Sequence, residues 1–264
     1  MKLIDKTFTR LGSHGSQRLL GWATLLSLAA TAVVALLLVP PDSTQGDVQR
    51  LMYVHVPAAW LAFMSFGVVF VASIAYLRTG RTQWDRIAVA SAELGVQFCA
   101  LTLVLGSLWG QPVWGTWWTW DPRLTTTAVL LLIYVGYLAV RRVADNPNRR
   151  ARWSAVIGIV GFLDVPIVHM SVVWWRSLHQ EATVLRPGAP TMAGSMLLTL
   201  LLAVVAFSIA YTYLMVARLR VGRAEDRAAS TVLSAPTPRA QAPSRAQIAS
   251  PASVVPVTRS SNHA

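Results

Sequence analysis

Six continuous apolar runs of about twenty residues constrain this chain more than any other feature of its sequence. They lie approximately at 19–39, 57–77, 87–108, 124–140, 153–172 and 191–217. A helix of about 20 apolar residues crosses the ~30 Å hydrocarbon core of a bilayer, where backbone polar groups must be satisfied within each segment. Only 13% of the residues are charged, against about a quarter in soluble domains. We therefore predict an all-α integral membrane protein with six transmembrane helices. The runs do not alternate with polar residues, which argues against a β-barrel.

The lysine and arginine residues indicate how these helices are oriented. Most of them lie at one set of helix ends, near the N-terminus, at 78–86, at 141–152 and in the tail from 218 to 259. The opposite ends carry only Arg50, Arg123, Arg176 and Arg186. Because basic residues favour the cytoplasmic side, we expect both termini in the cytoplasm. The net charge of +12 then indicates contact with anionic lipid rather than with nucleic acid.

Three segments follow from this pattern. Residues 1–18 are predicted to be a cytoplasmic N-terminal segment, and residues 19–220 a six-helix membrane domain. Residues 221–264 are rich in alanine, proline, serine and arginine. Such a segment buries too little apolar surface to offset the entropy of ordering it, so we expect a disordered cytoplasmic tail.

One loop, between the third and fourth apolar runs, is unusually rich in tryptophan. Residues 109–123 read WGQPVWGTWWTWDPR and hold five of the eleven tryptophans, interleaved with two glycines. Tryptophan is enriched at membrane surfaces in general, and an aromatic belt would explain two or three of these residues. Five indoles beside glycines, which leave room for close approach, favour a platform for a planar ligand. The predicted orientation places this loop on the outer side of the membrane.

Cysteine and histidine narrow the chemistry of such a platform. Cys99 is the only cysteine, so the chain has neither the Cys-x-x-Cys-His signature of c-type haem attachment nor a four-thiolate metal site. His55, just before the second helix, and His179, in an outer loop, share the outer face with the tryptophans. Two imidazoles beside a flat aromatic platform suggest haem. His169, about two turns inside the fifth helix, either joins the site or bonds a neighbouring helix.

Several charged residues are candidates either for the site or for a structural role. Arg123 and Arg176 are candidates for the haem propionates, and equally for interfacial anchors or for an ion pair with Asp121. Asp121 precedes Pro122 and can cap the fourth helix. The intramembrane acids Glu93 and Asp164 have open roles: Glu93 can reach the membrane interface, and Asp164 can pair with a base or stay protonated.

Three motifs together resemble one family. The stretch 109–123 is similar to the tryptophan-rich WWD signature of haem-handling proteins, and the flanks MYVHVPAA at 52–59 and PIVHMSVVWWRSLHQ at 166–180 resemble the CcmC branch. The resemblance covers roughly residues 15–220. It implies that haem b is held at the periplasmic face of the bacterial cytoplasmic (inner) membrane, with His55 and His179 as axial iron ligands. The expected cofactor-binding residues are Trp109, Trp114, Trp117, Trp118, Trp120, Asp121, Arg123, Trp174, Trp175 and Arg176.

The resemblance also implies a division of labour. CcmC-type proteins load haem, as transferable cargo, onto the periplasmic chaperone CcmE, and their partners are the ATP-binding-cassette subunits CcmA and CcmB and the small subunit CcmD. This chain has no Gly-x-x-x-x-Gly-Lys-Ser/Thr phosphate loop, so we expect a haem transporter subunit rather than an enzyme. Two alternatives are a bis-histidine cytochrome b-type electron-transfer subunit and a CcsA-like haem-attachment protein. The first needs histidines within facing helices, and the second carries more helices and histidines.

Overall fold

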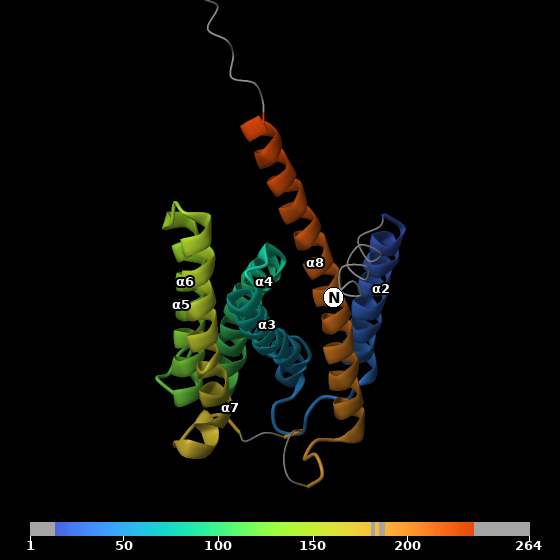
Figure 1. The fold of residues 1–264 in the computed structure, drawn as a ribbon. Helices are drawn as coiled ribbons and strands as arrows, with labels where there is room; N and C mark the ends of the chain where they lie inside the picture. The colour runs from blue at the N-terminus through green and yellow to red at the C-terminus, as the bar shows by residue number, and fades with distance from the viewer. Residues whose placement is uncertain (1–13, 181–182, 185–187, 235–264) are drawn as a thin grey trace, which may run out of the picture. The chain divides into compact units, whose positions relative to one another are not determined.

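The computed structural model describes residues 14–180, 183–184 and 188–234, and these residues form helices and connecting loops with no strand. The chain divides into two compact units, Met1–Arg223 and Ala224–Ala264. Figure 1 shows the helices in chain order: α2 (His14–Val33), η1 (Val34–Leu38), η2 (Asp47–Leu51), α3 (Met52–Thr79), α4 (Thr82–Trp114), α5 (Pro122–Val143), α6 (Pro147–Phe162), α7 (Asp164–Trp174) and α8 (Gly194–Ser234).

Among the described residues, six helical segments are long and apolar enough to cross a membrane, which confirms the predicted fold class. They are Gly15–Leu38, Asp47–Thr79, Thr82–Trp114, Pro122–Val143, Pro147–Trp174 and Gly194–Ala228. The fifth segment combines α6 and α7, which meet at Leu163. Pro166 cannot donate the backbone hydrogen bond that would join α7 to the end of α6, and this accounts for the interruption.

Local sequence signals explain where several helices begin and end. Asp121 caps α5 by accepting a hydrogen bond from the Arg123 N–H at 2.9 Å, and Asn146 caps α6 in the same way. A proline follows each cap and supplies the backbone angle of a first helical residue. At the other end, Gly115 terminates α4 with φ +77°, a left-handed conformation that favours glycine.

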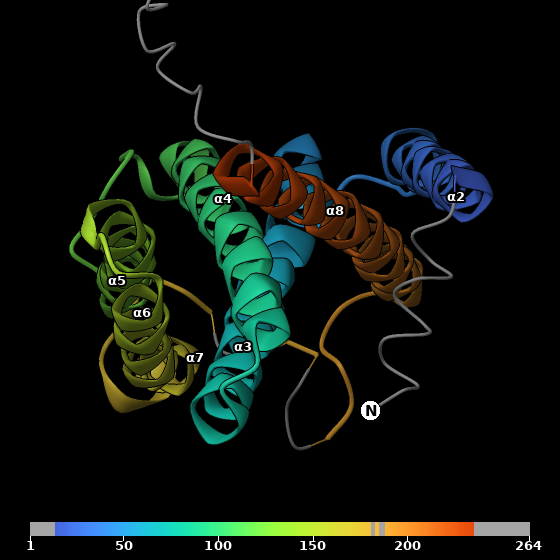
Figure 2. The ribbon, with the colours of Figure 1, turned by 45° about the horizontal axis from the view of Figure 1, so that its top comes forward.

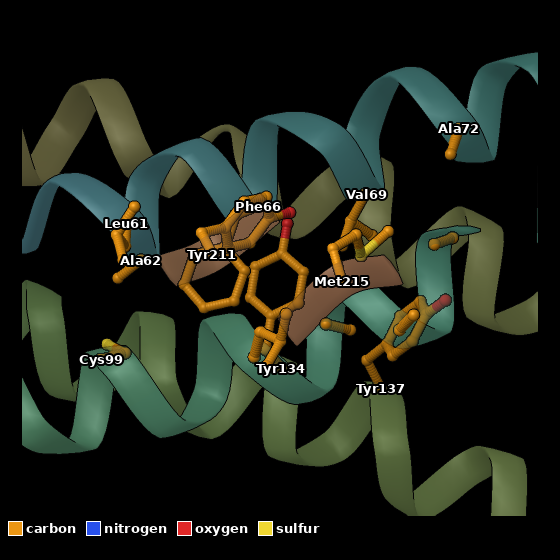
Figure 3. Packing of buried hydrophobic residues seen from close by; sticks show 14 of the residues in the cluster. Leu61, Ala62, Phe66, Val69, Ala72, Cys99, Tyr134, Tyr137, Tyr211 and Met215 are labelled. Carbon is orange, nitrogen blue, oxygen red and sulfur yellow. The ribbon is translucent and has the colours of Figure 1, made fainter. Parts of the chain in front are cut away.

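The helices pack around α3 and α4. Within the first unit, α5, α6 and α7 lie on one side of this pair, and α8 and α2 lie on the other (Figures 1 and 2). Phe66 of α3 stacks on Tyr134 of α5 with ring centroids 3.7 Å apart, and Tyr211 and Met215 of α8 join the same cluster (Figure 3). Gly95 of α4 permits this packing, because a Cβ there would lie 2.6 Å from the Phe66 ring.

The intramembrane acids have different surroundings. Glu93 forms an ion pair with Arg218 of α8, at 2.5 Å to Nε and 3.0 Å to Nη2, a partner that sequence reasoning did not identify. Asp164 begins α7, and its Oδ2 atom is buried without a hydrogen-bond partner.

Both ends of the membrane domain differ from the predicted boundaries. Helix α2 begins at His14, before residue 19, and α8 continues through residue 221 to Ser234. The segment predicted to be disordered is therefore helical as far as Ser234. Most of the predicted N-terminal segment (1–13) and the rest of the tail (235–264) lie outside the described residues.

Candidate functional site

Two adjoining cavities lie near the start of α3 and the end of α4. The larger has a volume of about 440 Å³ and the smaller about 230 Å³. The two cavities share six of their lining residues: His55, Val56, Gly106, Arg123, His169 and His179. The fold thus brings three histidines from α3, α7 and the loop after α7 to one place.

His55 lies within α3, three residues after its first residue, Met52. This differs from the expectation of a loop histidine ahead of the helix. The 3₁₀ turn η2 leads directly into α3 at Met52, so the helix begins before Pro57, the residue that had suggested its start. The His55 Nδ1 atom is buried and has no hydrogen-bond partner. Its ring lies edge-on to Trp109, with centroids 5.7 Å apart.

His179 lies in the loop after α7, as expected, and contacts Asp121. Its Nδ1 atom is 3.0 Å from Asp121 Oδ1. Burial lowers the pKa of His179 more than the neighbouring Asp121 raises it. The ring also lies edge-on to Trp114, at 4.7 Å between centroids. With its Nδ1–H donated to Asp121, a neutral His179 carries its lone pair on Nε2.

Asp121 supports the site without lining either cavity. Its carboxylate accepts hydrogen bonds from the Arg123 N–H at 2.9 Å, the Ser177 hydroxyl at 2.8 Å and the Leu178 N–H at 2.7 Å. Burial raises the pKa of Asp121, but these hydrogen bonds outweigh burial and bring it below its ordinary value. The capping role that the sequence suggested is therefore present, and the same side chain also holds the loop that carries His179.

The tryptophan-rich stretch is divided between a helix and a loop, rather than forming one loop. Helix α4 continues to Trp114, so Trp109 and Trp114 lie on its last turns and line the larger cavity. Trp117, Trp118 and Trp120 follow the helix end and are exposed, Trp120 to 82%. These three indoles do not line either cavity.

Arg123 lies at the cavities, whereas Arg176 and the neighbouring tryptophans Trp174 and Trp175 do not. Arg123 lines both cavities, and its Nη2 atom donates to the His169 carbonyl at 3.4 Å. Trp174, Trp175 and Arg176, at the end of α7, are exposed and do not line either cavity. Of the two predicted propionate contacts, the structure brings only Arg123 to the cavities.

Gln45 and Gly106 are among the residues of the cavity wall that sequence reasoning missed, and it left His169 undecided. Gln45 lines the larger cavity and accepts a hydrogen bond from the Trp109 indole N–H at 2.9 Å. Gly106 faces His55: a Cβ at this position would lie 3.1 Å from His55 Cε1. The turn at Asp42, whose Oδ1 accepts from the Gln45 N–H, was the available signal for Gln45. No local signal distinguishes Gly106.

Comparison with known proteins places the chain in a family. A family model described as heme exporter protein C, CcmC, matches residues 4–234. The chain is 40% identical to heme exporter protein C of Bradyrhizobium diazoefficiens over 222 residues, which cover 83% of this chain and 84% of that protein. It is 36% identical to heme exporter protein C of Haemophilus influenzae over 203 residues, or 77% and 82% of the two chains. A match over nearly the whole chain, together with six membrane-spanning helices, shows that this protein belongs to the CcmC (heme exporter protein C) family.

Proposed function

We propose that this protein binds haem b between His55 and His179 and delivers it, on the periplasmic side of the inner membrane, to a CcmE-type chaperone for cytochrome c maturation. One observation carries the proposal: two imidazoles from distant segments line one cavity, each beside an indole ring. The names of the relatives, heme exporter protein C, support a haem-handling role rather than an enzymatic one.

The size of the larger cavity and its nitrogen atoms support this proposal. Its volume of about 440 Å³ lies in the range of about 300–1,000 Å³ typical of small-molecule sites. The orphaned Nδ1 of His55 is a ring nitrogen that a metal can satisfy. Neutral imidazole is a good ligand for iron, and His179 has its other nitrogen engaged by a carboxylate, as is common for metal-binding histidines.

Arg123 is the base best placed for a haem propionate, because it lines both cavities. The other predicted haem contacts are all exposed outside the cavity lining: Trp117, Trp118, Trp120, Trp174, Trp175 and Arg176. We propose that they contact the edge of the haem that projects from the cavity. Haem held by two imidazoles at the end of a helix bundle, with one edge exposed, suits transfer to another protein.

The orientation and the partners belong to the same proposal. The basic residues of the α5–α6 connection, such as Arg141 and Arg149, lie at the opposite end of α5 from Arg123. Under the positive-inside rule this end is cytoplasmic, which puts the cavities on the periplasmic side. Because the sequence lacks a phosphate-binding loop, ATP hydrolysis would come from CcmA acting with CcmB, and CcmD would complete the complex.

The optical spectrum of the purified protein tests the ligand assignment. We expect a six-coordinate, bis-imidazole haem spectrum, and weaker haem retention in His55→Ala and in His179→Ala. His263→Ala, in the C-terminal tail, is the matched control and should retain the wild-type spectrum. If both cavity variants kept the wild-type spectrum and haem affinity, the axial assignment would be wrong.

Covalent loading of the chaperone tests the delivery step. In cells that lack this chain, the periplasmic chaperone should contain no covalently bound haem, and the wild-type gene should restore it. Intact loading together with loss of a quinol-linked activity would instead favour a cytochrome b-type electron-transfer subunit.

A further inference from the structure

Asp121 is the most extensively hydrogen-bonded side chain near the two cavities, although it lines neither of them. Its side chain is 2% exposed, and each of its two oxygens accepts two hydrogen bonds. Oδ1 accepts from the Arg123 N–H and lies 3.0 Å from His179 Nδ1, and Oδ2 accepts from Ser177 and Leu178. Among these partners, Arg123 and His179 line both cavities and Leu178 lines the larger, but only His179 contacts Asp121 through a ring that can bind a metal.

The contact between Asp121 and His179 selects one form of the imidazole. A carboxylate can only accept a hydrogen bond, so the Nδ1 atom of His179 must carry the proton. The lone pair of the neutral ring is then on Nε2. A buried carboxylate that accepts from Nδ1–H also increases the electron density of the imidazole ring. This makes Nε2 a stronger electron-pair donor to a metal.

Hydrogen bonds to and around Asp121 connect the His179 loop to the start of α5. As the N-cap of α5, Asp121 is fixed to the first turn of a membrane-spanning helix. Through Ser177 and Leu178 it also fixes the two residues before His179. The Ser177 hydroxyl in turn accepts from the His179 N–H at 3.0 Å. One carboxylate therefore ties the histidine's ring and its backbone to α5.

We infer that Asp121 is a positioning residue for haem binding: it holds His179 with Nε2 available to the iron and strengthens it as an axial ligand. This inference rests on the proposed function, because it takes His179 to be a ligand. In this role Asp121 acts on His179 and does not itself contact the haem. The position of His179 then depends on the first residues of α5, which Asp121 caps.

A double-mutant cycle in haem affinity tests whether Asp121 acts through His179. Asparagine is as good an N-cap as aspartate, so Asp121→Asn keeps the cap while removing the charge. We expect Asp121→Asn to weaken haem binding about 10- to 100-fold in the wild-type background, the effect usual for an outer-shell partner of a metal ligand. In the His179→Ala background the same substitution should change affinity by less than about threefold. An equal loss in both backgrounds would show a purely structural role and overturn the inference.

The reduction potential of bound haem gives a second readout that a structural role would not move. With Asp121→Asn at saturating haem, the potential should rise, because a weaker axial donor stabilises ferric iron less. An unchanged potential would also overturn the inference, and this measurement needs no His179 variant. As a control, Asn146→Ala removes the equivalent cap of α6, at a sequence position more than twenty residues from His55, His169 and His179. It should leave both affinity and potential unchanged.

The outcomes separate this inference from the proposed function. If His179→Ala alone left haem affinity and spectrum unchanged, His179 would not be a ligand, and the proposed function would fail at that point. If His179→Ala weakened binding but Asp121→Asn changed neither affinity nor potential, only the positioning role would fail.

Discussion

Gly106 is the position where the smallest substitution should separate haem binding from stability. It lies inside α4 and faces His55, and a Cβ there would be 3.1 Å from His55 Cε1 and 3.7 Å from Nδ1. Ordinary contacts are 3.4–4 Å, so Gly106→Ala must displace the imidazole by a few tenths of an ångström. Trp109, which lies edge-on to the ring, limits the directions in which the ring can move.

Gly106→Ala should change the stability of the protein and its haem affinity in different directions. Alanine in place of a helix-interior glycine stabilises a helix by about 0.5–1 kcal/mol, so the stability of the folded protein should not fall. If His55 must turn by about 30° to avoid the new methyl group, returning it to its ligating orientation costs about 0.5–1.5 kcal/mol. That cost corresponds to a loss of about two- to twelvefold in haem affinity.

Titration of the haem Soret band measures this loss, and unfolding in detergent measures stability. Gly136→Ala in α5 is the matched control, because nothing lies within 4 Å of a Cβ built there. It should gain the same helix stabilisation and bind haem as the wild type does. Equal affinities of Gly106→Ala and Gly136→Ala would refute the reasoning that Gly106 makes room for a ligating His55.

Two further predictions concern the membrane interior and the third histidine. Glu93→Gln should destabilise the protein by about 3 kcal/mol, because Arg218 loses the carboxylate that neutralises it. The value is at the low end because each side chain is about 30% exposed. The double variant with Arg218→Gln should unfold in detergent at a denaturant concentration closer to that of the wild type, and a larger loss in the double variant would contradict the pairing argument. His169→Ala should change haem affinity by less than about tenfold and retain the bis-imidazole spectrum, since His169 lines the cavities without being a proposed ligand. Loss of the six-coordinate spectrum in this variant would make His169 a ligand instead.

The two sides of the site are built in different ways, and this bears on how haem would be released. His55 is part of the regular helix α3 and lies against α4 through Gly106 and Trp109. His179 is in a loop whose position depends on hydrogen bonds to Asp121. A loop held by a few hydrogen bonds opens at lower cost than a packed helix. A partner that competed for those hydrogen bonds would therefore weaken the His179 side first.

The sequence alone determined the features that depend on local composition. Hydrophobic length predicted all six membrane-spanning segments, because the thickness of a bilayer sets the length of an apolar helix directly. The pair Asp121–Pro122 predicted the cap of α5, because capping involves only neighbouring residues. The motif at 109–123 and its flanks were sufficient to indicate the family.

Boundaries were less well predicted where two local signals competed. Pro57 suggested the start of the second span, but proline is also tolerated within α3 once the preceding 3₁₀ turn has begun the helix. The third apolar run ends at residue 108, which suggested a loop from Trp109 onward, yet α4 continues to Trp114. Helix ends of this kind depend on which hydrogen bonds the flanking residues find in the fold.

Only the tertiary structure decided which side chains meet. Asp121 and His179 are distant in sequence, and their contact depends on how the loop after α7 lies against the start of α5. The same holds for Gly106 against His55, and for the choice of Trp109 and Trp114 over the exposed indoles that follow them. The physical reason is that contacts between helices depend on the rotation and packing of each helix about its neighbours, and no residue pattern within a single segment encodes them.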